Sequence, residues 1–346
     1  MKVLELCLSH GVGGLELYAA KVVKHYQSDN HVQCYAVTRK DSFLDKRLMN
    51  DGISTHHLRV LGRNLPVLAA RKLASMMETW QIDVLHMHWG KDLLLAALAK
   101  RFCRRNIRLV YTRQMAISRD KHDAYHRFVY RYVDCYITIT RLLQEQARKN
   151  LPLSPENIEL LYYGVPAADV TADTSCAGFN RDAKIRPEAF KVGLFGRIEE
   201  GKGQHLLLEA IRQLSSKGYD IQGLLIGHAM DKAYLDNLLT KADENGLTNN
   251  FRYFGFHPQP TSIMGCFDVV VLASNAETFG LVLAEAMRAG TAVIGTNAGG
   301  VPEIIDHGET GYLFAEPMRA GSWKLSIMEK PVICLHQGVA LSWLVI

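Results

Sequence analysis

Two carboxylates, Glu277 and Glu285, stand eight residues apart in the segment SNAETFGLVLAEAMRAGTAVIGTNAGG. The apolar run before Glu277 predicts a buried strand, and the apolar spacing after it predicts a helix with Glu285 about two turns inside. N–H groups at a helix start bind anions, and carboxylates accept paired hydrogen bonds from a diol. The segment therefore predicts a site for a phosphorylated ligand that carries hydroxyl groups. The N–H groups concerned are those of Thr278, Phe279, Gly280 and Leu281.

Either glutamate taken alone would more simply be a helix cap or a solvent-facing residue. We interpret the pair as a site because the apolar strand, the glycine turn at Gly280 and the loop GTNAGGVPE accompany it. A glycine at this turn also lets a ligand approach the backbone closely.

Two cations follow another apolar run, Phe190–Phe195, in the segment KVGLFGRIEEGKGQH. The run predicts a strand that ends at Gly196, with Arg197 next and Lys202 at the opening of the following helix. Cations at the carboxyl edge of a parallel sheet, beside a helix N-terminus, neutralise a diphosphate. Each cation alone would be an ordinary surface residue, but the glutamates on the same sheet favour a shared site.

A glycine-containing loop, SHGVGGLE, joins the first predicted strand to its helix. Gly11, Gly13 and Gly14 resemble part of a dinucleotide-binding fingerprint, but Glu16 occupies the position of its third glycine. The loop is weak evidence by itself. Gly13 and Gly14 still allow a phosphate or a sugar to approach the backbone.

Two histidines, His86 and His88, end a predicted strand, and their alternation places both imidazoles on one face. We interpret His86 as a core histidine with satisfied hydrogen bonds. His88, at the strand tip, is a candidate to hydrogen-bond a sugar, with a core role as the equal alternative. A metal site would require further ligands, and no Asp-x-Asp motif occurs, so we expect no metal.

Apolar runs alternate with amphipathic stretches along the chain, which predicts βαβ units and parallel sheets. The expected fold class is α/β, with two Rossmann-like, doubly wound domains facing a central cleft. We expect a first domain over residues 1–165, a linker over 166–188, a second domain over 189–314 and an atypical tail over 315–346. Strands are predicted at Lys2–Leu8, His31–Thr38, Asp83–His88, Ile107–Thr112, Asp134–Thr140, Phe190–Phe195, Ile221–Ile226, Asp268–Ala273 and Ala292–Gly295. Helices are predicted at Leu15–Tyr26, Val67–Trp80, Leu93–Phe102, Gln204–Ser215 and Lys232–Asn245.

The formal net charge of +5 is unevenly distributed along the chain. Residues 1–170 carry 25 Lys and Arg against 16 Asp and Glu, a balance of +9, whereas residues 171–346 carry 15 against 19, a balance of −4. The first half is therefore expected either to meet an anionic partner, such as a membrane surface or a phosphorylated acceptor, or to be a solvated basic surface.

Seven cysteines occur singly, without a Cys-x-x-Cys pair, so we expect isolated thiols in a reducing cytoplasm, several of them in the core. No apolar run approaches the roughly 20 residues that span a bilayer. The amino-terminal run has no basic region or cleavage site of a secretion signal.

These segments together resemble the GT-B glycosyltransferases, in particular the large retaining family numbered four. The resemblance runs from Val3 to about Phe314, with the general character of bacterial lipopolysaccharide and capsule enzymes. It implies an acceptor-side domain followed by a nucleotide-sugar-binding domain. The family's functional residues fall on Glu277 for the donor sugar hydroxyls, Glu285 for the ribose, Arg197 and Lys202 for the diphosphate, Gly13 and Gly14 for the first loop, and His88 for the strand-tip histidine.

The resemblance implies transfer of a sugar with retention of its anomeric configuration and without an enzyme nucleophile. Arg197, Lys202 and the helix start near Phe279–Leu281 would stabilise the leaving diphosphate, which would take the acceptor's proton, and His88 would position the sugar. The implied partners are a nucleotide-sugar donor, UDP favoured over GDP, and a glycan or lipid-linked saccharide acceptor. We expect no cofactor and no nucleic-acid partner, and a cytoplasmic location at the inner face of the cytoplasmic membrane.

Three alternatives remain open. A nicotinamide-dependent dehydrogenase would also be doubly wound, but its glycine fingerprint fails at Glu16. A GT-B epimerase would share the architecture and isomerise the donor instead of transferring its sugar. A nucleotide-sugar-binding protein, inactive because of its tail, is the third. The sequence after Phe314 departs from the family pattern, as a short variant or as a truncated or frameshifted end.

Overall fold

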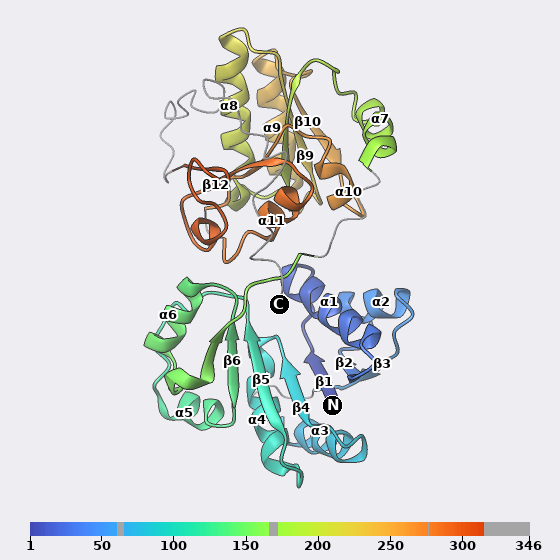
Figure 1. Cartoon of the computed structure of the whole chain (residues 1–346), viewed down its shortest axis with the longest axis vertical. Helices are drawn as coiled ribbons and strands as arrows, with labels where there is room; N and C mark the ends of the chain where they lie inside the picture. Colours follow the sequence, from blue (N-terminus) through green and yellow to red (C-terminus); the bar gives the residue numbers. More distant parts are fainter. Residues whose placement is uncertain (61–65, 166–171, 276, 315–346) are drawn as a thin grey trace. The chain divides into compact units, whose positions relative to one another are not determined.

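Two compact units make up the chain, Met1–Tyr162 (unit 1) and Tyr163–Ile346 (unit 2) (Figure 1). The computed structural model describes residues 1–60, 66–165, 172–275 and 277–314. Each unit contains one parallel sheet with helices between successive strands. The tail over residues 315–346 lies outside the described residues, so its predicted character is not addressed by the structure.

The sheet of unit 1 has seven strands in the order β3-β2-β1-β4-β5-β6-β7. The chain leaves β1 in one direction and returns to place β4 on its other side, so β1 and β4 meet at the switch point of a doubly wound sheet. The strands are β1 (Lys2–Cys7), β2 (Gln33–Thr38), β3 (Thr55–His57), β4 (Val84–Met87), β5 (Arg108–Arg113), β6 (Cys135–Thr138) and β7 (Ile158–Leu160). The helices are α1 (Gly14–Ser28), α2 (Phe43–Asn50), α3 (Val67–Thr79), α4 (Leu93–Phe102), α5 (Ala124–Tyr130) and α6 (Arg141–Asn150).

The sheet of unit 2 repeats this plan with six strands in the order β10-β9-β8-β11-β12-β13. Its switch point therefore lies between β8 and β11. The strands are β8 (Phe190–Phe195), β9 (Ile221–Ile226), β10 (Phe251–Gly255), β11 (Val269–Leu272), β12 (Ala292–Thr296) and β13 (Tyr312–Phe314). The helices are α7 (Ala172–Asp182), α8 (Gln204–Ser216), α9 (Lys232–Glu244), α10 (Thr261–Met264) and α11 (Leu281–Arg288).

Both faces of each sheet are covered, which explains the nearly continuous apolar strands. In unit 1, Leu4 and Leu6 of β1 pack with α3 and α4, whereas Cys7 packs with α1 and α2 on the opposite face. In unit 2, Leu194 of β8 packs with α8 and α9, whereas Phe195 packs with α7 and α11. Because side chains alternate along a strand, Glu5 of β1 lies on the same face as Cys7, beneath α1 and α2.

The α/β class and the parallel sheets predicted from the sequence are confirmed. The predicted strands Phe190–Phe195 and Ile221–Ile226 match β8 and β9 residue for residue. Within the predicted linker, residues 172–182 form α7. Phe179 of α7 packs in the core of unit 2. The helix is therefore stabilised by this packing, although its local sequence does not predict a helix.

A disulfide bond joins Cys176 of α7 to Cys266, which follows α10. The expectation of isolated thiols is therefore wrong for this pair, which is separated by 90 positions in the sequence. It is confirmed for Cys7 and Cys34, which are buried and free. Within the described ranges, no helix combines the length and apolarity that crossing a bilayer requires.

Candidate functional site

The cations and carboxylates predicted in the second half meet at the carboxyl edge of unit 2, where β8 and β11 are neighbours. Arg197 follows β8, and Glu277 follows β11. Lys202 ends the 3-10 helix η3 (Glu200–Lys202), two residues before α8 begins, and does not open α8 as predicted. Its Nζ lies 2.9 Å from Oε2 of Glu277, and both side chains are 22% exposed. The residue predicted to bind the phosphate, Lys202, is thus in direct contact with the residue predicted to bind the sugar, Glu277.

Arg197 forms a separate ion pair, with its Nη2 2.9 Å from Oε1 of Glu199. The Arg197 side chain is about half exposed, so solvent screens this pair and its exchange for another anion costs little. The Arg197 carbonyl accepts a hydrogen bond from Nε2 of the buried Gln204 at 2.8 Å, which ties the loop after β8 to the start of α8. The backbone that carries Arg197 is fixed, whereas its guanidinium remains available to a ligand.

The loop that follows β12 holds the backbone of Glu277 in place. The Gly300 N–H donates a hydrogen bond to the Glu277 carbonyl at 2.9 Å. Gly299 has a φ of +62°, and a Cβ at this position would lie 1.9 Å from the same carbonyl oxygen. Only glycine fits such a close approach with left-handed backbone. The GTNAGG segment singled out in the sequence therefore supports Glu277.

Gly280 is the N-cap of α11, with a φ of +99° that turns the chain into the helix. Phe279, which precedes it, is buried and packs edge-to-face on Tyr163 with 5.0 Å between ring centroids. Glu285 lies four residues after Leu281, the first helical residue, so it is about one turn inside the helix and not two as predicted. Thr278 and Glu285 are both half-buried. The start of α11 thus lies in the same strand-to-helix connection as Glu277.

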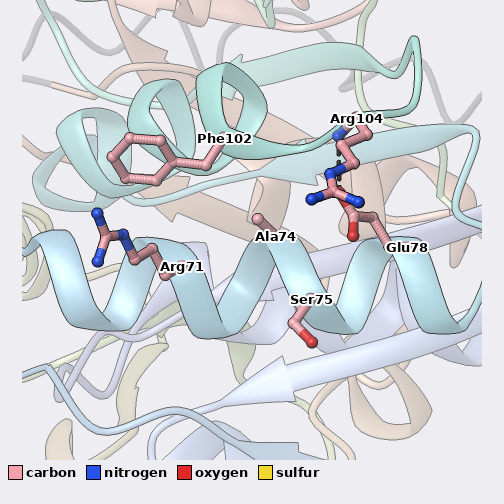
Figure 2. A pocket seen from close by; sticks show the side chains of 6 residues that line it. All are labelled: Arg71, Ala74, Ser75, Glu78, Phe102 and Arg104. Carbon is pink, nitrogen blue, oxygen red and sulfur yellow. Dashed lines mark hydrogen bonds between the residues drawn. The ribbon is translucent and has the colours of Figure 1, made fainter.

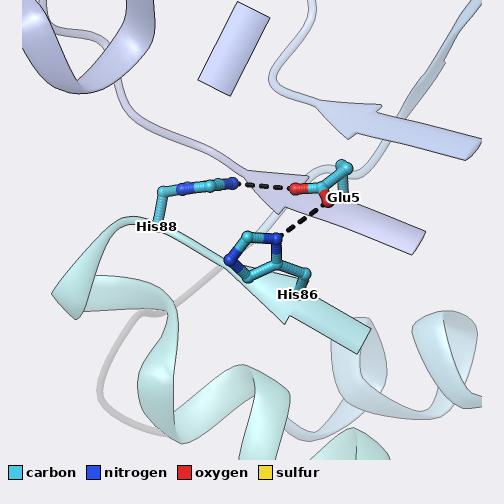
Figure 3. A group of neighbouring side chains, drawn as sticks. All are labelled: Glu5, His86 and His88. Carbon is cyan, nitrogen blue, oxygen red and sulfur yellow. Dashed lines mark hydrogen bonds and ion pairs between the residues drawn. The ribbon is translucent and has the colours of Figure 1, made fainter. Parts of the chain in front are cut away.

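A second group of polar side chains lies at the switch point of unit 1 (Figure 3). Glu5 and His86 are direct neighbours in the register between β1 and β4. The Glu5 carboxylate contacts both imidazoles, with Oε1 2.9 Å from His86 Nδ1 and Oε2 2.8 Å from His88 Nε2. The other nitrogen of His86 pairs with the Thr112 hydroxyl at 2.7 Å, which agrees with the interpretation of His86 as a satisfied core residue. Sequence reasoning missed Glu5, although a charge inside the apolar run KVLELC was a usable signal.

Glu5 is an ionised carboxylate inside the core. Burial raises its pKa, but the charge of His86 and the hydrogen bonds from both histidines outweigh burial and bring the pKa from 4.5 to about 2. Burial and then the charge of His86 lower the pKa of His88 below its usual 6.5, despite Glu5. Burial, followed by the negative charge of Glu5, raises the pKa of Tyr18 and of Tyr26 on α1 to about 12. The negative charge of Glu5 therefore affects the pKa of side chains on α1, which covers this face of the sheet.

Glu5, His86 and His88 also offer ligand atoms within 4.8 Å of one another, in residue types that bind divalent metal ions. The expectation of no metal was formed without Glu5. The nitrogen–oxygen distances of 2.8 and 2.9 Å are those of hydrogen bonds, and each carboxylate oxygen receives one of them. The two hydrogen bonds from the imidazoles stabilise the buried Glu5 carboxylate without a metal ion. Metal independence stays a prediction.

The glycine loop of unit 1 leads into α1. Gly13 is the extended N-cap, and Gly14 is the first helical residue. Among the described residues, a Cβ at Gly14 would meet nothing within 4 Å, and a Cβ at Gly13 would meet only Glu16, at 3.7 Å. Packing inside the chain does not require glycine at either position, which supports room for a ligand. The buried Glu16 accepts a hydrogen bond from the Ser9 hydroxyl, whose oxygen accepts one from the Gly11 N–H at 3.0 Å.

A surface pocket lies between α3 and α4 of unit 1 (Figure 2). Arg71 lies over the Phe102 ring, 5.7 Å from its centroid, and the Arg104 N–H donates to Glu78 at 2.7 Å. The lining contains no residue of the predicted donor site, so we assign it no part in donor binding. The residues that line it are Arg71, Ala74, Ser75, Glu78, Phe102 and Arg104.

The basic stretch near this pocket is the part of the positively charged first half that we expect to meet an anionic membrane. Two of its cations pair with acidic residues: Lys100 binds Asp134, and Arg105 lies 3.6 Å from Asp83. These pairs reduce the charge that the stretch presents. The stretch comprises Lys100, Arg101, Arg104 and Arg105.

Two family models match the chain. Residues 12–169 match the model described as Glycosyltransferase Family 4, and residues 179–329 match the model described as Glycosyl transferases group 1. The second match continues past Phe314, the point after which the sequence was expected to depart from the family.

Several curated relatives are named as enzymes that transfer sugars. N-acetyl-alpha-D-glucosaminyl L-malate synthase from Bacillus anthracis is 25% identical over 255 residues, which are 70% of this chain and 64% of that protein. The lipopolysaccharide core biosynthesis mannosyltransferase LpsB from Rhizobium meliloti is 25% identical over 275 residues, 75% of this chain and 74% of that protein. The chain thus spans just under two thirds of the length of the first of these relatives.

Solved structures share the fold. HepE from Anabaena, solved in complex with UDP and glucose, matches with a TM-score of 0.76 and 24% identity, over 91% of this chain and 86% of that chain. The apo form of the lipopolysaccharide outer core galactosyltransferase WaaB matches with a TM-score of 0.70 and 17% identity, over 93% of this chain and 87% of that chain.

Proposed function

Because the chain belongs to the group 1 glycosyltransferases and has the GT-B fold, we propose that it transfers a hexose-type sugar from a nucleotide sugar to a glycan or lipid-linked saccharide. The transfer retains the anomeric configuration of the sugar, and the donor is a UDP-sugar in preference to a GDP-sugar. The observation that carries this proposal is the Lys202–Glu277 ion pair at the switch point of unit 2, beside the start of α11.

Each residue of this edge has a role in the proposed reaction. Lys202 and Arg197 bind the diphosphate, together with the N–H groups at the start of α11. Glu277 accepts hydrogen bonds from the sugar hydroxyls, and Glu285 accepts them from the ribose. As the sugar–phosphate bond breaks, the cations and the helix N-terminus stabilise the charge that develops on the leaving diphosphate. That phosphate takes the proton of the acceptor hydroxyl, so no enzyme nucleophile takes part.

Unit 1 contributes His88 and the loop with Gly13 and Gly14. His88 positions the transferred sugar and stabilises the oxocarbenium-like state, while the glycines leave space beside the backbone for the donor. The preference for UDP is supported by HepE, a structural neighbour solved with UDP and glucose. The acceptor class is supported by LpsB, a relative named for lipopolysaccharide core biosynthesis.

The proposed location is the cytoplasm, at the inner face of the cytoplasmic membrane. Each exposed basic residue near an anionic surface contributes about 1 kcal/mol, and this attraction weakens with salt. We expect the protein to sediment with anionic vesicles at low salt and to be released at high salt. Absence of binding at low salt would rule out this location.

A donor screen by mass spectrometry tests the function. The purified chain is incubated with a panel of UDP- and GDP-sugars and with lipid-linked saccharides, and both nucleotide and acceptor masses are measured. We expect UDP release from one UDP-sugar and a matching gain of one hexose on the acceptor, with retained configuration by NMR. Isomerised donor without UDP release would identify an epimerase, and nucleotide binding without turnover would identify an inactive binder.

A further inference from the structure

The two nitrogens of His88 have different surroundings. Nε2 faces the Glu5 carboxylate at 2.8 Å. Nδ1 is buried and has no hydrogen-bond partner among the residues that the structure describes. The whole residue is only 1% exposed, so a hydroxyl reaches this nitrogen only when the side chains that cover it move. A buried polar atom without a partner is unfavourable unless a ligand or an ordered water supplies one.

The Glu5 carboxylate determines which nitrogen of His88 carries the proton. An ionised carboxylate only accepts hydrogen bonds, so a nitrogen 2.8 Å from it must be the N–H. Oε1 of the same carboxylate pairs with His86 Nδ1, so both oxygens of Glu5 have a histidine partner. The neutral His88 ring therefore has its hydrogen on Nε2 and a lone pair on Nδ1.

We propose that Glu5 is a positioning residue for the transfer reaction: it fixes His88 in the Nε2–H tautomer, so that Nδ1 accepts a hydrogen bond from a hydroxyl of the donor sugar. This inference rests on the proposed function for its substrate and adds a residue and a hydrogen-bond direction to it. His88 then acts as a neutral acceptor for a sugar hydroxyl, and not as a donor or a cation.

A purely structural role would not explain the choice of residue. A buried charge with hydrogen-bonded partners is often no more stabilising than an apolar residue of similar size. On the face of β1 that carries Glu5, the flanking side chains are those of Val3 and Cys7, which are both buried, so an apolar side chain would suit the strand. A carboxylate at this position fixes the tautomer and the ring plane of His88, which an apolar residue cannot do.

The wild-type protein gives the first test, because it needs no variant that might misfold. Ring nitrogens of ¹⁵N-labelled histidine resonate at clearly different frequencies when protonated and unprotonated, and His88→Gln assigns the His88 signals by their loss. We expect His88 to be neutral with a protonated Nε2. An Nδ1–H tautomer or an imidazolium at neutral pH would overturn the proposal, whether or not the chain proves to be a glycosyltransferase.

The second test uses Glu5→Gln, which keeps the shape and removes the charge. The Gln amide can donate to Nε2, which moves the His88 hydrogen to Nδ1. We expect kcat for sugar transfer to fall roughly 10- to 100-fold, the worth of one hydrogen bond to a reacting ligand, with UDP affinity unchanged within about twofold. Unchanged kcat would overturn the proposal, as would an equal loss of UDP affinity, since that would reflect general disruption. Failure of the proposed function is seen separately, as absence of transfer by the wild type.

Discussion

The two units place their polar side chains at the same topological position but in different surroundings. In unit 1, Glu5 and His86 lie within β1 and β4, where they are buried on both sides of the switch point. In unit 2, Arg197, Lys202 and Glu277 lie in the connections that follow β8 and β11, where they are partly exposed. Side chains inside paired strands are held by the sheet, whereas those in loops can adjust to a ligand. We therefore expect substitutions in unit 1 to change mainly the rate of transfer, and substitutions in unit 2 to change the affinity for the donor as well as the stabilisation of the leaving diphosphate.

Replacing His88 by Ala should give the largest effect on turnover. Removal of a group that stabilises the reacting sugar is expected to lower kcat by about 10²–10³. UDP affinity should change little, because the proposed nucleotide ligands lie in unit 2. Steady-state kinetics and calorimetry with UDP measure the two quantities, with His25→Ala, an exposed residue of α1, as the matched control. A parallel loss of UDP affinity would break the division between the units.

Glu285→Ala and Lys202→Ala test the other side of the comparison. A charge-assisted hydrogen bond contributes about 1.5–3 kcal/mol, so each variant should bind the UDP-sugar roughly 10- to 100-fold more weakly. Both variants should fold normally. Glu244→Ala and Lys232→Ala, at exposed positions of α9, are matched controls for the loss of each charge. Unchanged affinity in both site variants would remove the donor assignment of unit 2.

Gly299→Ala should have a smaller effect, transmitted through the backbone of Glu277. The new Cβ would lie 1.9 Å from the Glu277 carbonyl oxygen, so the loop must move and carry Glu277 with it. Gly246→Ala is the control, because Gly246 also has a positive φ, of +71°, with no atom within 4 Å of the added Cβ. Both changes introduce backbone strain of about 1–3 kcal/mol, measurable by denaturant unfolding. Only Gly299→Ala should also weaken donor binding, and equal donor affinities would show that this loop does not position Glu277.

Metal removal should have the smallest effect. We expect transfer activity to survive EDTA, because the carboxylate oxygens of Glu5 are occupied by two imidazoles and the Glu277 carboxylate pairs with Lys202. Activity is measured before and after chelation, and again after Mn²⁺ or Zn²⁺ is added back. Loss that Mn²⁺ or Zn²⁺ restores would assign a metal to one of the two units and would make the Glu5 group the first candidate.

The sequence was sufficient for features that depend on local spacing. Apolar periodicity identified β8 and β9 with their observed bounds, and the motif around Glu277 identified the edge of unit 2 before its pairing was known. It could not reveal the contact between Glu5 and His86, because these residues are 81 positions apart and meet only through the register of β1 with β4. It also missed α7 and the Cys176–Cys266 bond, which depend on packing of a weakly helical segment against the core.

The Lys202–Glu277 ion pair competes with any ligand that binds either of its two residues. Any ligand that separates the two residues must replace both halves of the pair, since a partly buried charge left alone is costly. A free phosphate would pair with Lys202 but leave Glu277 without a partner. A free sugar would bind Glu277 but leave Lys202 without a partner. In the proposed reaction a nucleotide sugar brings both groups on one molecule, so the pair works as a filter that rejects either fragment alone. Selectivity against the phosphate ions and free sugars of the cell would then come from the ion pair itself.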